Sequence, residues 1–298
     1  MCFSPRKMSF QSVFEKNLIF INGKGGVGKT LLARAVSHHL ASQGFKTLNA
    51  VFEDPLREPG ELIQPDPSLP KLWSFNCEAH SAFEEYIQQK IPLPHVSRLF
   101  LKNKLIRYLS KAAPGIHELV LLGKIWFERT HYDRIVVDMP STGYGLTMFQ
   151  SVVNFGKLFQ SGPIHKDAEL MLETLRDPKQ TGHLLVTLPE EMPIREAIDL
   201  QGYLQKLFPE NHSQFVVNKK FPHLETLTRQ EDSLWKNPVP KSLLDYALKK
   251  SHTEAEHLQL LRERGKNFQE IPYIPPTLHN APENLVRDLA SYLKEGTS

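Results

Sequence analysis

Short apolar runs bounded by turn residues alternate with segments of helical periodicity along most of the chain. This alternation predicts an α/β fold, with a mostly parallel sheet covered by helices on both faces. The expected strands are residues 18–22, 47–52, 134–138, 184–188, 215–218 and 271–274. The expected helices are residues 29–42, 193–207 and 282–293, which have apolar positions three and four residues apart.

Two stretches exceed what a minimal nucleotide-binding sheet requires. Residues 77–129, punctuated by Pro92, Pro94 and Pro114, and residues 146–176 are both helical in pattern. We expect them to form an inserted helical subdomain at the carboxyl edge of the sheet, where open α/β sheets bind ligands. No linker divides the chain, so we expect one domain over residues 1–298, with residues 1–16 as an N-terminal extension.

Composition limits the classes of function. The net charge of +3 over 298 residues does not indicate nucleic-acid binding. Only Cys2 and Cys77 are present, which excludes a disulfide framework or a zinc clasp within one chain and fits a reducing cytoplasm. The most apolar stretch, residues 119–127, is far shorter than the ~20 residues of a membrane span. We therefore expect a cytoplasmic protein without a transmembrane segment.

A glycine-rich loop follows the first expected strand and leads into the first expected helix, which is the setting that a phosphate-binding loop requires. Its backbone N–H groups could wrap phosphates, since glycines allow close approach and the helix N-terminus adds partial positive charge. The expected nucleotide-binding residues of the loop are Gly23, Lys24, Gly25, Gly26, Val27, Gly28, Lys29, Thr30 and Leu31. Lys29 would neutralise the β and γ phosphates of ATP, or the β phosphate of ADP.

Two aspartates stand where strands are expected to end. Asp138 ends the third strand, from which a carboxylate can reach Mg²⁺ through its water shell, and Asp54 follows the second strand. Asp54 could orient or deprotonate the attacking water. Thr30, Asp54 and Asp138 are therefore the expected contacts of Mg²⁺ and its water shell. Either aspartate alone could instead be an ordinary capping residue at the end of a strand.

The block from Lys24 to Thr30 resembles the deviant Walker A motif of the SIMIBI-class P-loop NTPases. That group includes the arsenite-pump ATPase, the tail-anchored-protein targeting ATPase, MinD, ParA and the nitrogenase iron protein. The resemblance implies a P-loop NTPase three-layer sandwich that works as a nucleotide-sandwich dimer. In that group the extra lysine commonly reaches the partner's phosphates, so the resemblance gives this catalytic role to Lys24.

Other motifs are similar to the branch that contains the arsenite-pump and tail-anchor targeting ATPases. Residues 138–144, Asp-Met-Pro-Ser-Thr-Gly-Tyr, resemble its switch II, and Asp54-Pro55 resembles the start of its switch I. Residues 185–191, 216–218 and 274–276 are similar to its strands and adenine-contacting loops. The resemblance implies that Asn218 bonds the base edge and that Pro275 and Pro276 lie at the nucleotide.

Departures from the family pattern limit what the resemblance implies. Tyr144 replaces the usual histidine of switch II, and switch I continues with Leu56-Arg57-Glu58 in place of the common sequence. The cysteines that bind arsenite and the zinc-binding Cys-x-x-Cys of the branch have no counterpart. Metalloid activation and zinc-bridged dimerisation are therefore not expected.

The inserted helical segments could serve a hydrophobic or protein client. Trp73, Trp126, Trp235 and the apolar positions of residues 99–109 and 119–127 could line a client groove, or they could pack the core of the subdomain itself. The basic face of the first segment could also meet a partner or an anionic surface.

The leading functional hypothesis is an ATP-hydrolysing dimeric switch, as a homodimer or a heterodimer with a related ATPase, that couples nucleotide state to a partner. One alternative is a catalytically weak regulatory subunit of such a heterodimer. Another is a surface-patterning ATPase of the MinD or ParA type, although the chain shows no terminal membrane helix and little charge for DNA. A partner could hold the protein at a membrane.

Overall fold

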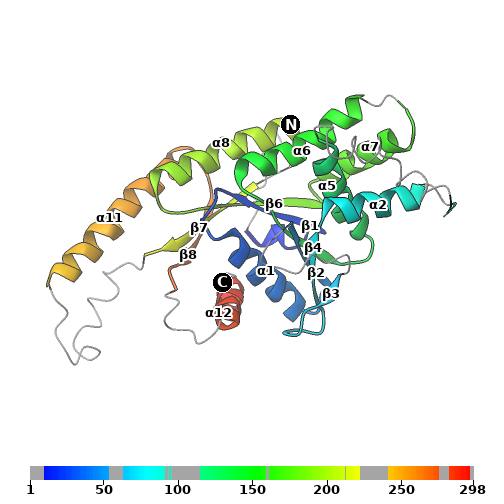
Figure 1. The fold of residues 1–298 in the computed structure, drawn as a ribbon. Helices are drawn as coiled ribbons and strands as arrows, with labels where there is room; N and C mark the ends of the chain where they lie inside the picture. Colours follow the sequence, from blue (N-terminus) through cyan, green and yellow to red (C-terminus); the bar gives the residue numbers. More distant parts are fainter. Residues whose placement is uncertain are drawn as a thin grey trace, which may run out of the picture.

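The computed structural model describes residues 10–53, 63–90, 93, 95, 115–158, 161–211, 213–221, 241–274 and 282–295. In these residues eight strands form one sheet in the order β3-β4-β2-β5-β1-β6-β7-β8 (Figure 1). Neighbouring strands are parallel except β3 and β4. The predicted α/β fold with a mostly parallel sheet is confirmed.

The observed elements agree with the predicted ones to within a few residues wherever both exist. The strands are β1 (Leu18–Gly23), β2 (Thr47–Phe52), β3 (Gln64–Pro65), β4 (Leu72–Cys77), β5 (Arg134–Asp138), β6 (Thr181–Thr187), β7 (Ser213–Lys220) and β8 (Phe268–Pro272). The helices are η1 (Phe10–Val13), α1 (Lys29–Ser42), α2 (Ala79–Lys90), α5 (Ile116–Glu128), α6 (Thr142–Leu158), α7 (Pro163–Arg176), α8 (Glu191–Leu207), α11 (Lys241–Glu263) and α12 (Pro282–Glu295). None of the helices in this described part is long and apolar enough to cross a membrane.

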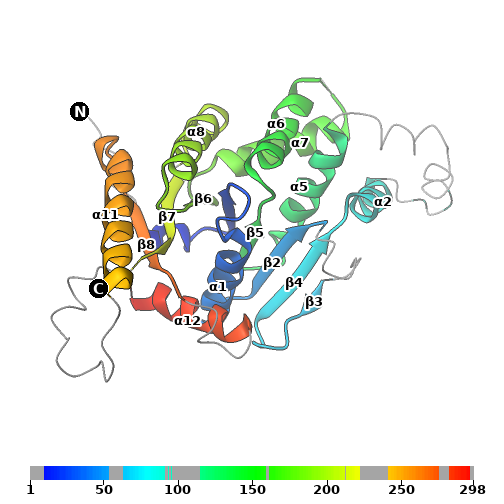
Figure 2. The same ribbon diagram turned by 60° about the vertical axis from the view of Figure 1, so that its left-hand side comes forward.

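Helices cover both faces of the sheet because its central strands are apolar on both sides. Ile19 and Ile21 of β1 face α1 and α12 in one core. Leu18 and Phe20, which alternate with them, belong to a second core with α5, α6, α7 and α8. Figure 2 shows α1 and α12 on one side of the sheet and α6 and α8 on the other.

The structure adds η1, β3, β4 and α11, for which the sequence pattern predicted no element. β4 pairs with β2 over its whole length and ends at Cys77. The segment between the second and third predicted strands therefore contains a further strand, and the helices α2 and α5 come after it. In the described part of residues 77–129 the chain forms α2 and α5, and α6 and α7 cover 146–176. Residues from α5, α6 and α7 share one hydrophobic core with the sheet, and a separate helical subdomain stays a prediction.

A titratable side chain is enclosed in that second core. His183 of β6 is 1% exposed and stacks between the rings of Phe20 and Phe208, with centroids 5.4 and 5.9 Å away. Its Nδ1 lies 3.3 Å from the Asn22 amide nitrogen. Burial lowers the pKa of His183 to about 3, so the ring is neutral at physiological pH.

Candidate functional site

The predicted phosphate loop lies between β1 and α1, at the carboxyl edge of the sheet. β1 is a central strand, flanked by β5 and β6, so the ends of three parallel strands meet beside the loop. The first helical N–H groups of α1 follow directly, and the Leu32 N–H donates to the Gly28 carbonyl at 3.0 Å. This arrangement gives a bound anion backbone donors and the positive end of a helix.

Three glycines of the loop, Gly23, Gly26 and Gly28, have a positive φ, and at the first and last of them a Cβ would also clash. Gly23 has a φ of +151°, and a Cβ there would overlap the Val186 carbonyl oxygen of β6. Gly28, the N-cap residue of α1, has a φ of +96°, and a Cβ there would overlap the Asn218 amide. Both positions therefore require glycine on grounds of backbone conformation and of space. A Cβ at Gly25 or Gly26 would meet no atom within 4 Å, so the outer side of the loop is open.

Both lysines of the loop make contacts within the chain. The Lys29 ammonium donates to the Lys24 carbonyl oxygen at 2.9 Å. Lys29 is buried, which lowers its pKa, whereas the negative charge of Asp138 acts in the opposite direction. The Lys24 ammonium lies 2.6 Å from the Glu196 carboxylate of α8, and both side chains are partly exposed. The structure thus places Lys29 against the loop and Lys24 at its solvent side.

The structure brings together most of the other predicted site residues that it describes. Thr30 is exposed in the first turn of α1, and Leu31 beside it is half-buried. Asp138 ends β5, next to β1, and its charge acts on Lys29. Thr30 thus lies on the helix that follows the loop and Asp138 on the strand next to β1, and their role at Mg²⁺ stays a prediction.

Asn218 has a contact that the sequence did not indicate. Its amide nitrogen donates to the Val27 carbonyl oxygen at 2.9 Å, and its amide oxygen accepts from the Lys219 N–H at 2.9 Å. Asn218 is 5% exposed. It therefore ties the end of β7 to the phosphate loop in this structure, and its predicted contact with the base edge stays a prediction.

Three predicted site residues, Asp54, Pro275 and Pro276, lie outside the described residues. The residue before Asp54 is described and has an unusual backbone: Glu53 has a φ of +47°. Its carboxylate lies 3.0 Å from His117 Nε2 and accepts a hydrogen bond from the Ala79 N–H at 3.3 Å. Because Ala79 begins α2 and His117 lies in the first turn of α5, Glu53 joins the end of β2 to both helices.

Tyr144 lies in the first turn of α6, beside this junction. It is half-buried, and burial raises its pKa to about 12, with the negative charges of Glu118 and Glu53 acting in the same direction. The side chain at the position of the usual histidine therefore carries a proton throughout the physiological pH range. Its hydroxyl can donate or accept a hydrogen bond, but it cannot take up a proton as a general base at neutral pH.

Sequence reasoning missed Glu196, Glu53 and His117. Glu196 is 172 residues from Lys24, and a glutamate on an amphipathic helix carries no signal for such a contact. Glu53 differs, since a glutamate directly before the switch I motif could have been examined as part of the site.

A family profile described as Anion-transporting ATPase (ArsA) matches residues 16–171, which include the loop, β2, α2, α5, β5 and α6. The matched region is more than half of the chain and contains all of the predicted catalytic residues.

Curated relatives agree with this match. The chain is 28% identical to ATPase BagA of Mycobacterium tuberculosis over 70% of this chain and 66% of that protein. It is 28% identical to an arsenical pump-driving ATPase of Escherichia coli over 73% of this chain and 38% of that protein. The chain thus spans just under two thirds of the mycobacterial relative and well under half of the pump ATPase. From the profile match and the loop geometry together, this chain belongs to the ArsA family of anion-transporting ATPases.

Proposed function

We propose that the chain binds ATP with Mg²⁺ at the loop of residues 23–30 and hydrolyses it, as a dimeric switch. The observation that carries the proposal is the open loop itself, with the Lys29 ammonium against its backbone and Asp138 at the end of the neighbouring strand. Membership of an ATPase family supports the same reading.

The loop has the space and the donors that a triphosphate needs. Its outer side at Gly25 and Gly26 is open, and the first turn of α1 supplies further N–H groups. Lys29 now donates to a carbonyl oxygen of its own loop, and phosphate oxygens would replace that acceptor. The exchange keeps the cation paired throughout, which avoids leaving a buried charge without a partner.

The residues that would hold Mg²⁺ are the exposed hydroxyl of Thr30 and the carboxylate of Asp138, the latter through water. When bound, the metal ion neutralises charge that develops on the phosphates. Asp54 would orient the attacking water. Lys29 would stabilise the charge of the β and γ phosphates, because phosphoryl transfer depends mainly on positioning and electrostatics.

Lys24 supports the proposal of a dimer. It lies on the exposed side of the loop, where its ammonium reaches Glu196 but no part of its own phosphate-binding backbone. A second chain facing the loop could receive this lysine at its nucleotide. That transfer requires Lys24 to leave Glu196, so the ion pair is a contact of the free chain that dimerisation would replace.

Metalloid binding is not part of the proposal. Cys77 is fully buried, and burial raises the pKa of its thiol well above the usual range. A buried, protonated thiol is a poor ligand for a soft metal or metalloid. The described residues also contain no cluster of three histidine, cysteine or acidic side chains that could hold a metal ion. The pump function in the names of some relatives is therefore not transferred to this chain.

Steady-state ATP hydrolysis by Lys24→Ala, Lys29→Ala and Asp54→Asn would test the mechanism. We expect turnover to fall at least 100-fold in each, because each removes charge or positioning that acts in the transition state. Lys179→Ala, which removes an exposed lysine at the opposite edge of the sheet, is the matched control and should keep wild-type turnover. Near wild-type rates in all three variants would overturn the proposal.

The same assays separate the alternatives. Tight ATP binding without turnover, followed by turnover when a related chain is added, would favour a regulatory subunit of a heterodimer. ATP-dependent binding to lipid vesicles or DNA would favour a surface-patterning ATPase.

A further inference from the structure

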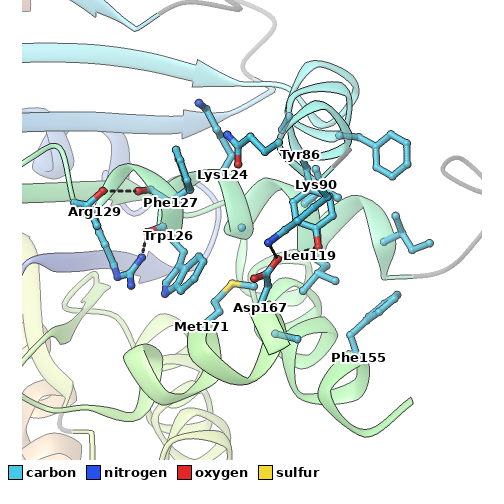
Figure 3. Close-up of a pocket in the computed structure, with 18 residues that line it drawn as sticks. Tyr86, Lys90, Leu119, Lys124, Trp126, Phe127, Arg129, Phe155, Asp167 and Met171 are labelled. Atoms are coloured by element: carbon cyan, nitrogen blue, oxygen red, sulfur yellow. Dashed lines mark hydrogen bonds and ion pairs between the residues drawn. The ribbon is translucent and has the colours of Figure 1, made fainter. Parts of the chain in front are cut away.

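A cavity of about 370 Å³ lies between α2, α5, α6 and α7, away from the phosphate loop (Figure 3). Its size falls within the usual range of small-molecule sites. Its walls are mainly apolar, and the larger apolar side chains include Phe83, Trp126, Phe127, Phe155 and Met171, with Leu119 beside them. The proposed nucleotide chemistry uses none of these residues.

The floor of the cavity is the outer face of α5. Residues 116, 119, 120, 123, 126 and 127 line it, at the three- and four-residue spacing of one helical face. At the centre of this face stands Gly123, where a Cβ would meet no atom within 4 Å. Gly in a helix interior costs roughly 1 kcal/mol relative to Ala, and here it leaves open space that a larger side chain would fill.

Most of the polar groups around the cavity are already paired. Lys90 lies 2.5 Å from Asp167, and Asp167 also accepts a hydrogen bond from the Tyr86 hydroxyl at 3.0 Å. These contacts join α2 to α7 across the cavity (Figure 3). Lys124 lies 2.8 Å from two glutamates that are not part of the cavity wall. These paired groups therefore offer no free charge to a ligand.

Arg129 is different. Its guanidinium lies 4.0 Å from the centre of the Trp126 ring, and Nη1 donates to the Trp126 carbonyl oxygen at 2.8 Å. No carboxylate of the described residues lies within ion-pair distance, and burial alone lowers its pKa. Arg129 therefore lines an apolar cavity as a cation whose remaining N–H groups suit a planar anion.

We propose that this cavity binds a small apolar molecule that carries one carboxylate, such as a free fatty acid. The apolar chain lies over Gly123 against Met171 and Phe155, and the carboxylate pairs with Arg129. The apolar walls supply the binding energy of the chain. The guanidinium, which has no carboxylate partner among the described residues, selects the acid over a neutral compound of the same shape.

The cavity is too small to hold a whole membrane-spanning helix. A membrane-spanning helix of about 20 residues is ~30 Å long and ~10 Å wide, which is a volume on the order of 2,000–3,000 Å³. The cavity holds a small fraction of that volume, and the contacts of Lys90, Tyr86 and Asp167 cross it. A single acyl chain, by contrast, is small enough to fit between these walls.

Quenching of tryptophan fluorescence by a brominated dodecanoic acid would test the proposal, because Trp126 lies in the cavity wall. The titration is run without nucleotide and below the concentration at which the acid aggregates, so its outcome does not depend on ATP hydrolysis. We expect saturable quenching that is lost in Trp126→Phe. The methyl ester of the acid should bind about tenfold more weakly, the loss of one charged hydrogen-bonded pair.

Gly123→Leu is the decisive variant. It fills the cavity at a position with open space and favours the helix, so we expect a folded protein with no saturable quenching. Gly202→Leu, which makes the same change at an exposed position of α8 with equal room, is the matched control and should bind like the wild type. Arg129→Gln should bind acid and ester alike. Quenching that is absent in the wild type, that persists in Gly123→Leu, or that is equal for acid and ester would overturn the proposal.

Discussion

Replacing Glu196 by glutamine removes the charge that holds Lys24 in the free chain, while it keeps the shape and the hydrogen-bonding capacity of the side chain. In the proposed dimer Lys24 must leave Glu196 to reach the nucleotide of the partner. The ion pair therefore competes with dimerisation, and its loss should favour the dimer. We expect Glu196→Gln to dimerise more tightly than the wild type in the presence of a slowly hydrolysed ATP analogue.

The size of the effect follows from the exposure of the pair. The side chains of Lys24 and Glu196 are 44% and 35% exposed, so water screens the attraction and the pair contributes at most about 1 kcal/mol. A dimer breaks two such pairs, which gives up to about 2 kcal/mol, or roughly a 30-fold lower dissociation constant. Raising the salt concentration should shrink the difference between variant and wild type, because it screens the pair.

Sedimentation velocity at a series of protein concentrations would measure the dimer dissociation constant directly. Glu270→Gln is the matched control, since Glu270 lies 3.9 Å from Arg262 with similar exposure but does not contact Lys24. The control should dimerise like the wild type. Unchanged or weaker dimerisation of Glu196→Gln would refute the reasoning, and would mean that Glu196 does not compete for Lys24.

Three further predictions concern stability. Gly23→Ala should lower the free energy of unfolding by about 1–3 kcal/mol, visible as a lower melting temperature, because its φ and the nearby Val186 carbonyl oxygen leave no room for a Cβ; an unchanged melting temperature would contradict this. Asn218→Ala should cost about 1–3 kcal/mol in urea unfolding, since the buried Val27 carbonyl oxygen loses its donor. The pKa of His183 is about 3 when folded and 6.5 in the unfolded reference, so the unfolded chain alone gains its proton as the pH falls below 6.5. Stability should therefore drop by about 1.4 kcal/mol between pH 7.5 and 5.5 from this group, and His183→Phe should remove that part of the pH dependence.

The sequence predicted the elements that carry strong local signals. β1, the phosphate loop and α1 combine a fully buried and mainly apolar strand, glycines at the two positions where a Cβ would clash, and a helix of regular period. The central strands were predicted for the same reason, since strands buried on both faces are continuous apolar runs. The position of Asp138 beside the loop followed from the end of such a strand.

The elements that the sequence did not predict lie where burial is partial. β4 carries Ser74 and Asn76 among its apolar residues and pairs with a two-residue edge strand, so its pattern is mixed. α11 exposes most of its surface, and only a few positions such as Leu258 and Leu261 are fully buried. Contacts such as Lys24 with Glu196 depend on where α8 docks, which no local pattern of residues specifies.

The left-handed backbone of Glu53 lies directly after β2, at the point where this strand is connected to α2 and α5. A non-glycine residue with positive φ is strained, and here its carboxylate is held by one contact at the start of α2 and one at the start of α5. A return of Glu53 to an ordinary φ would swing the carboxylate away from both helices at once. The single side chain of Glu53 thus links α2 to α5, and these two helices are also two walls of the Arg129 cavity.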